Sequence, residues 1–168
     1  MVCSSTSMAD SELKQRAGEY FRRAYEHQQQ GEYEEAIELY SHSLEAFPTA
    51  EAYTFRGWAH SFQGNYAQAI ADCRRAIKLD PDFGNPYNDI GVYLMQRNQP
   101  DGAIPWLEKA KLASRYEPRH YPYINLGHIY AARGELIKAI DEFKGALKLA
   151  PWDDRIRSQL AELSAKLN

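Results

Sequence analysis

The chain has 168 residues, of which 44% are hydrophobic and 26% charged, a composition typical of folded proteins that excludes a largely disordered chain. Its two cysteines, Cys3 and Cys73, are too few for a disulfide framework and lack the paired spacing of a zinc site, so we expect no metal and no cofactor. Twenty Lys and Arg residues against 23 Asp and Glu give a net charge of -3, which disfavours nucleic acid as a partner.

The N-terminal residues 1–10 are mostly small and polar, and we expect them to form a mobile tail. They contain no apolar signal core and no lipidation pattern, and no run of about 18 apolar residues occurs in the chain. We therefore expect a cytoplasmic protein that makes no contact with a membrane. The following segment, from Ser11 to Gln30, predicts a helix with Asp10 or Ser11 as its cap.

A repeated pattern dominates the rest of the chain. Gly-Glu-Tyr-Glu-Glu-Ala-Ile at 31–37 is echoed by Gly-Asn-Tyr-Ala-Gln-Ala-Ile at 64–70, and two weaker copies follow. The copies align on Ala36, Ala69, Ala103 and Ala139, at intervals of 33, 34 and 36 residues. In register with them recur an aromatic residue (Tyr20, Tyr53, Tyr87, Tyr123), a small residue (Ala24, Gly57, Gly91, Gly127), a turn residue (Gly31, Gly64, Asn98, Gly134) and a closing proline (Pro48, Pro81, Pro151).

Each recurring position has a role in a helix-turn-helix unit. Intervals of three and four residues place side chains on one face of a helix, and small residues let two helices cross closely. Gly64 predicts a left-handed stop after one helix, and Pro81 a break after the next. A unit of this size cannot cover its own apolar faces, so successive units must stack.

These columns resemble the tetratricopeptide repeat family over residues 17–151. The resemblance implies an all-α fold, a right-handed α-solenoid of four helix-turn-helix repeats at about 17–49, 50–83, 84–119 and 120–151 within residues 11–151. Arg23 and Arg56 depart from the pattern, since the family usually has leucine in that column, whereas Ile90 and Leu126 conform.

The C-terminal segment 152–168 predicts one more amphipathic helix. Its apolar residues Ile156, Leu160, Leu163 and Leu167 are spaced by four, three and four residues, with charges between them. We expect this helix to cap the exposed end of the stack.

The third copy is irregular. Pro100 stands where a tyrosine is expected, and Pro105 lies about one turn into a helix that would begin at Pro100, where it would bend or delay that helix. The copy is two residues longer than the nominal repeat, with the surplus near residues 115–122. This basic and aromatic segment is either a loop that binds a partner or a longer connection that absorbs an insertion, and the second alternative is favoured because loops tolerate extra length cheaply.

The chain lacks the sequence motifs of common enzymes and metal sites. The one candidate for catalysis is a Cys/His pair, His60 with Cys73, which we expect to face each other across a helix pair. Both residues occupy packing columns, and a buried cysteine in apolar surroundings is usually inert. We therefore predict that the protein is not an enzyme.

The resemblance also implies a concave groove, lined by the first helix of each repeat, that holds a peptide. The groove-facing stripe lies about 100° around the helix from the tyrosine stripe. The candidate binding residues on it are Phe21, Tyr25, Thr54, Phe55, Trp58, Phe62, Asn88, Asp89, Val92, Met95, Ile124, Asn125 and His128. The first half of this stripe is aromatic, and the second half carries amides.

Some family members hold the acidic C-terminus of a chaperone with a clamp of Lys, Arg and Asn side chains. In one frame these columns hold Phe21, Tyr25, Phe55, Asn85 and Asp89, and in the other they hold Thr54, Trp58, Asp89, Tyr121 and Asn125. Neither frame supplies a cation, so a chaperone tail is disfavoured as the partner.

The predicted function is a non-enzymatic adaptor or scaffold that binds a protein or peptide partner in the aromatic groove. The aromatic side chains could instead pack between helices, an alternative that is stronger for Phe55 and Phe62 than for Trp58. A second hypothesis is a structural subunit that forms homo-oligomers through the groove or the solenoid ends. The opposite charge bias of two segments favours it, because residues 1–49 hold four basic and nine acidic side chains, whereas residues 84–151 hold nine basic and seven acidic.

Overall fold

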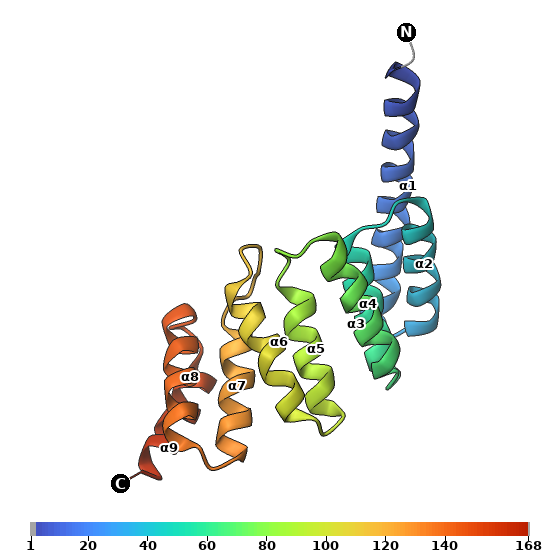
Figure 1. Ribbon diagram of the computed structural model, residues 1–168. Helices are drawn as coiled ribbons and strands as arrows, with labels where there is room; N and C mark the ends of the chain where they lie inside the picture. The colour runs from blue at the N-terminus through green and yellow to red at the C-terminus, as the bar shows by residue number, and fades with distance from the viewer. Residues whose placement is uncertain (1–2, 168) are drawn as a thin grey trace. The chain divides into compact units, whose positions relative to one another are not determined.

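The computed structural model describes residues 3–167, which form α-helices connected by turns and loops and no β-sheet (Figure 1). The helices are α1 (Cys3–Gln29), α2 (Tyr33–Ala46), α3 (Ala50–Phe62), α4 (Tyr66–Leu79), α5 (Asn85–Gln96), α6 (Pro100–Leu112), α7 (Tyr121–Ala132), α8 (Leu136–Leu149) and α9 (Asp154–Ala165). They divide into two compact units, Met1–Pro81 with α1 to α4 and Asp82–Asn168 with α5 to α9. The predicted all-α repeat fold is confirmed.

The turn inside each helix pair has the left-handed conformation that the repeat pattern predicts. The backbone φ angles are 80° at Gly31, 77° at Gly64, 74° at Gly134 and 58° at Asn98. Glycine adopts this conformation without steric cost, and asparagine is the residue that most often replaces it. The turn column of the sequence therefore marks the four places where one helix of a pair stops and the chain reverses.

The small-residue column marks where the two helices of a pair cross. A Cβ atom added to Gly91 would lie 2.5 Å from a methyl carbon of Leu107, and one added to Gly127 would lie 2.8 Å from the Phe143 ring. These distances are shorter than any van der Waals contact, so glycine is required by the close approach of α5 to α6 and of α7 to α8. Ala69 is fully buried, as its packing column predicts.

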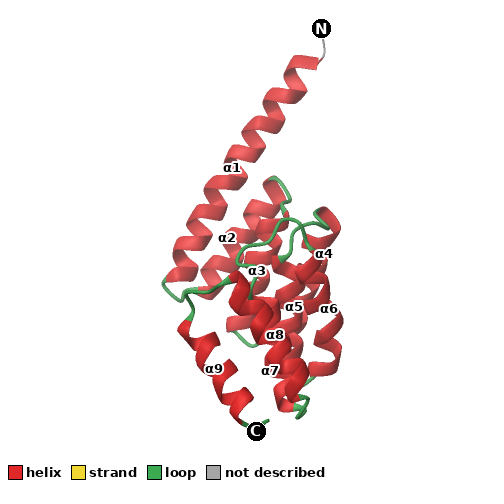
Figure 2. Cartoon of the chain, turned by 90° about the vertical axis from the view of Figure 1, so that its left-hand side faces the viewer, coloured by secondary structure: helices red, strands yellow, loops and turns green. Residues whose placement is uncertain are grey.

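Helix α1 is longer than the sequence analysis predicts. It begins at Cys3, so it includes residues 3–10 of the segment predicted as a mobile tail, and Asp10 and Ser11 lie inside the helix instead of capping it. Residues 1 and 2 of that predicted tail lie outside the described residues. The segment contains neither proline nor glycine, so nothing in it stops a helix from continuing. Figure 2 shows the N-terminal part of α1 projecting beyond the end of α2.

A buried ion pair explains one departure from the repeat pattern. The Arg56 guanidinium on α3 donates from Nε and Nη2 to the two carboxylate oxygens of Asp72 on α4, each at 2.8 Å. Its Nη1 also donates to the Ser41 hydroxyl on α2, at 3.0 Å. Arg56 therefore links three helices of the N-terminal unit where a leucine would only fill space.

The last helix, α9, packs against α8 in the C-terminal unit. The Asp153 side chain accepts a hydrogen bond from the backbone N–H of Arg155 at 2.9 Å and begins α9. Ile156 and Leu163 are buried against α8, whereas Leu167 is 51% exposed and Asn168 lies outside the described residues. The predicted amphipathic helix is confirmed, but its apolar stripe ends before Leu167.

The long connection between α6 and α7 is anchored to the start of α5. The backbone of Arg115 donates to Asp82 O at 3.0 Å and accepts from the Gly84 N–H at 2.9 Å. Tyr116 is only 5% exposed, and its ring fills the space beside Gly84. These contacts support the interpretation of this segment as a structural connection. Helix α6 begins at Pro100, as predicted, and contains Pro105.

Candidate functional site

The aromatic residues predicted for the groove form one continuous row in the N-terminal unit. We call Phe21 and Tyr25 of α1 and Phe55, Trp58 and Phe62 of α3 the aromatic row. The Phe55 ring lies 5.3 Å from Phe21, 5.8 Å from Tyr25 and 5.9 Å from Trp58, all edge to face. Trp58 in turn lies 5.6 Å from Phe62. Offset and edge-to-face rings at these separations attract one another, so the row is a cohesive surface.

The row has a buried edge and an exposed edge. Phe21 and Phe55 are half-buried and pack against the fully buried Tyr40. Tyr25, Trp58 and Phe62 are 41%, 40% and 52% exposed. The alternative that these rings only pack between helices therefore applies in part to Phe55 and does not apply to Trp58 or Phe62.

One member of this surface was missed by the sequence analysis. The Tyr33 ring, in the first turn of α2, stacks on Phe62 with a centroid distance of 4.7 Å and an interplanar angle of 3°. The periodicity of α1 and α3 carries no signal for this contact, because Tyr33 belongs to the second helix of its repeat. Tyr33 extends the aromatic surface to the end of the unit where Gly31 makes its turn.

Two polar residues beside the aromatic row, Thr54 and Gln28, are buried. Thr54 is 4% exposed, and its hydroxyl donates to the Ala50 carbonyl at 2.8 Å, so its predicted place in the groove lining is wrong. Gln28 is 5% exposed and its Oε1 accepts a hydrogen bond from the Tyr40 hydroxyl at 2.8 Å. Helical spacing alone does not distinguish a groove position from a neighbouring buried one.

The C-terminal unit brings together two of the predicted asparagines. Asn125 Nδ2 on α7 donates to Asn88 Oδ1 on α5 at 2.9 Å. Asn88 is 8% exposed, so its predicted role as a direct peptide contact is wrong, and it orients the half-buried Asn125 instead. Beside it, burial raises the pKa of Asp89 to about 7, and a hydrogen bond from Asn88 opposes part of that rise.

The remaining predicted residues of this unit differ in accessibility. Val92 is half-buried, Met95 packs against the core around Leu107, and Ile124 against the core around Phe143. His128 is exposed, and its ring lies 5.3 Å from the Phe143 ring, centroid to centroid. Partial burial lowers the pKa of its imidazole. None of these side chains forms a row comparable to the one in the N-terminal unit.

The candidate catalytic pair lies inside the N-terminal unit. Cys73 is fully buried, and His60 Nδ1 is buried without a hydrogen-bond partner. Burial lowers the pKa of His60, an effect that Asp72 opposes and Arg56 reinforces. Within residues 3–167 no three His, Cys, Asp or Glu side chains converge on a point that could hold a metal ion. Among the same residues no helix combines the length and apolar character that crossing a membrane requires.

Family models match most of the repeat region. Three of them, each described as a tetratricopeptide repeat, match residues 17–50, 50–83 and 121–151, together more than half of the chain. The irregular third copy lies outside these three stretches. The matched stretches contain the helix pairs α3/α4 and α7/α8 and, from residue 17 onward, the pair α1/α2.

Several curated proteins are similar in sequence to parts of the chain. Protein SGT1 homolog of Oryza sativa subsp. japonica is 47% identical over 57 residues, 33% of this chain and 16% of that protein. Small glutamine-rich tetratricopeptide repeat-containing protein 2 of Saccharomyces cerevisiae is 30% identical over 101 residues, 60% of this chain and 29% of that protein. Mitochondrial import receptor subunit TOM70 of Homo sapiens is 27% identical over 133 residues, 77% of this chain and 21% of that protein. The chain thus spans less than a third of the length of each.

Solved structures agree with the fold. The structure of pilF from Pseudomonas aeruginosa matches with a TM-score of 0.84 and 20% identity, covering 92% of this chain and 70% of that one. MamA from Desulfovibrio magneticus RS-1 matches with a TM-score of 0.72 and 22% identity, covering 90% and 85%. At these identities the likeness concerns the fold alone.

Proposed function

Because the chain belongs to the tetratricopeptide repeat family, whose members are protein–protein interaction modules, we propose that it is a non-enzymatic adaptor that binds a segment of a partner protein through the aromatic row. The proposal extends to the cytoplasmic location predicted above, which cell fractionation checks directly. The buried thiol of Cys73 argues against a catalytic role for the Cys/His pair, since a substrate has no access to it.

The observation that carries this proposal is the exposure of three adjacent aromatic side chains. Tyr25, Trp58 and Phe62 each leave between 40% and 52% of their surface in water while their neighbours hold them in place. Contiguous exposed apolar surface of this kind usually marks an interface, and aromatic anchors contribute most of the affinity there. The row is rigid before binding, because Phe21 and Phe55 anchor it to the core, so little conformational entropy is lost on association.

The chemistry of the row also indicates what the partner is not. No Lys or Arg belongs to the row or occupies the clamp columns of either frame, so a partner's terminal carboxylate would be buried without a counter-charge. We therefore keep the acidic chaperone tail outside the proposed partner class. In the C-terminal unit, Asp89, Val92, Met95, Ile124, Asn125 and His128 are the proposed secondary contacts.

The test is one substitution with two readouts. Trp58→Ala should reduce capture of partner proteins from native lysate by about 30-fold, equivalent to about 2 kcal/mol. The melting temperature should change little, since a core tryptophan would cost about 3–5 kcal/mol of stability and this one is 40% exposed. Trp152→Ala is the matched control, because Trp152 is 73% exposed and lies outside the row. Unchanged capture with Trp58→Ala contradicts the proposal.

Self-association is the second candidate function. It is favoured by the charge difference between residues 1–49, with four basic and nine acidic side chains, and residues 84–151, with nine and seven. Light scattering across a wide concentration range tests it. A constant monomer mass at high concentration excludes self-association and leaves the adaptor function as proposed.

A further inference from the structure

The aromatic row ends in a pocket that the sequence analysis did not identify. The pocket has a volume of about 430 Å³ and lies among α1, the end of α2 and the start of α3. Phe21 belongs both to the row and to the pocket lining, so the two surfaces are continuous. Cavities of about 150 Å³ accept a benzene ring, so this pocket has room for the largest apolar side chains.

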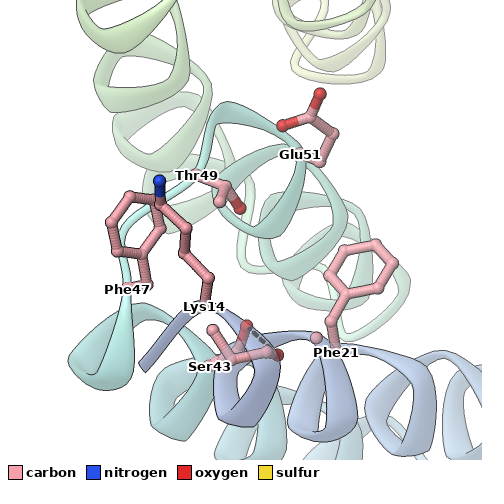
Figure 3. A pocket seen from close by; sticks show the side chains of 8 residues that line it. Lys14, Phe21, Ser43, Phe47, Thr49 and Glu51 are labelled. Carbon is pink, nitrogen blue, oxygen red and sulfur yellow. Dashed lines mark hydrogen bonds between the residues drawn. The ribbon is translucent and has the colours of Figure 1, made fainter. Parts of the chain in front are cut away.

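The walls of the pocket are mostly apolar. Figure 3 shows Lys14 and Phe47 on one side and Phe21 and Glu51 on the other. Ser43 lies at the floor, where its hydroxyl donates to the Ala17 carbonyl at 2.8 Å. Its hydrogen-bonding capacity as a donor is thus already used, and the floor is suited to hydrocarbon.

One side of the pocket mouth carries a positive charge. The Lys14 ammonium lies 5.0 Å from the centre of the Phe47 ring, on the opposite side of the pocket from Glu51 (Figure 3). A cation in this position attracts a carboxylate that comes within a few ångströms of the mouth. The ligand of the pocket is therefore expected to carry an acidic residue next to its apolar anchor.

Three polar side chains beside the row, Thr54, Ser61 and Gln28, form hydrogen bonds within the unit, although Gln28 Nε2 is buried without a partner. The Thr54 hydroxyl donates to Ala50 O, the Ser61 hydroxyl donates to Trp58 O at 2.7 Å, and Gln28 Oε1 accepts from Tyr40. An extended peptide laid along the row would bury its backbone N–H and C=O groups against aromatic carbon without partners. A helix satisfies its own backbone groups and needs only apolar side chains on one face.

These observations together define the ligand. We propose that the N-terminal unit binds an amphipathic α-helix of a partner protein, with one bulky apolar side chain in the pocket beside Gly18 and an acidic residue facing Lys14. From Glu51 to Phe62, α3 rises about 16 Å, so the ligand needs about three helical turns. Its apolar anchors then recur at i, i+4, i+7 and i+11, the last of them on Trp58 and Phe62.

This inference rests on the proposed function of the aromatic row. A substitution at Gly18 tests the pocket without changing the row. Gly18 lines the pocket, and a Cβ added there meets no atom within 4 Å, so the backbone at this position accepts a side chain such as that of Gly18→Leu. Leucine is also a better helix former than glycine, so the fold of α1 is retained. Glu19→Leu is the matched control, since it adds the same side chain one residue further, away from the pocket lining.

In the experiment, the full chain is the target on which ligands are selected from a displayed library of random 16-residue peptides. Enriched peptides should carry apolar residues at i, i+4, i+7 and i+11 and a carboxylate near one end, and become helical on binding. Gly18→Leu should weaken their binding about tenfold or more, Lys14→Glu about threefold or more, and Glu19→Leu should leave it unchanged. Trp58→Ala should weaken every selected peptide.

Four results would overturn the inference. Enrichment of proline-rich or alternating extended sequences excludes a helical ligand. Helical binders that are indifferent to Gly18→Leu exclude the pocket, while their loss with Trp58→Ala would leave the proposed function intact. A library that yields no binder on the wild-type chain, or binders indifferent to Trp58→Ala, counts against both the inference and the proposed function.

Discussion

Replacing Asp72 tests whether the buried ion pair holds the N-terminal unit together. The Asp72 side chain is 2% exposed, and it accepts two hydrogen bonds from Arg56, whose side chain is 17% exposed, and one from Arg75 at 2.7 Å. The hydrogen bond that Arg56 donates to Asp72 is the first cause of the raised pKa of Arg56. An arginine side chain stays protonated in proteins even without such a partner, so the guanidinium keeps its charge in the variant. In Asp72→Asn a buried cation would lose its counter-charge.

The expected cost follows from desolvation. Removing one partner of a buried ion pair costs about 3–5 kcal/mol, because the remaining charge has no compensation. Replacing both partners by apolar residues is often neutral or stabilising by about 1–4 kcal/mol. We therefore expect Asp72→Asn to lower the free energy of unfolding by about 3 kcal/mol, and Arg56→Met with Asp72→Leu to restore it. Arg75, 54% exposed, loses little when its partner is removed.

The assay is urea unfolding followed through Trp58, in a background where the other two tryptophans, Trp106 and Trp152, are phenylalanine. The signal then reports on the N-terminal unit alone, which matters because the unfolding of repeat proteins departs from a single two-state transition. The reasoning is refuted if Asp72→Asn costs less than about 1 kcal/mol, or if the double variant is as unstable as the single one.

Three further changes have defined outcomes. Because burial raises the pKa of Asp89 to about 7, the folded state binds its proton more tightly than the unfolded state, and the free energy of unfolding should fall as pH rises from about 4 to about 7. Asp89→Asn should remove this pH dependence and stabilise the C-terminal unit at pH 8 by about 2 kcal/mol. Urea unfolding at several pH values measures both effects. Ala139→Leu should overpack the fully buried crossing of α7 and α8 and cost about 1–3 kcal/mol, and an unchanged melting curve would contradict this pairing. Deleting residues 153–168 should expose the surface under Ile156 and Leu163, with a lower melting temperature or aggregation in light scattering; a monomeric, equally stable product would show that α9 is not a cap.

Features that depend on local sequence could be predicted in full. The left-handed turns at Gly64 and Asn98 follow from residue type, and the close helix crossings at Gly91 and Gly127 follow from the absence of a side chain. These features repeat with the helix pair, so four copies of one pattern reinforce each other. For the same reason the aromatic row was visible as a stripe at helical spacing.

Features that depend on how helices meet were beyond the sequence. The sequence showed Arg56 only as a departure from the repeat pattern. Its ion pair could not be predicted, because Asp72 is 16 residues away on another helix and only the crossing of α3 and α4 brings the two together. Thr54 has the spacing of a groove residue, yet packing around α3 buries it. The pocket beside Gly18 requires three helices at once, and no one-dimensional pattern encodes a space that three elements enclose. Periodicity determines which face a side chain occupies, and tertiary packing decides whether that face meets water, a charge or another helix.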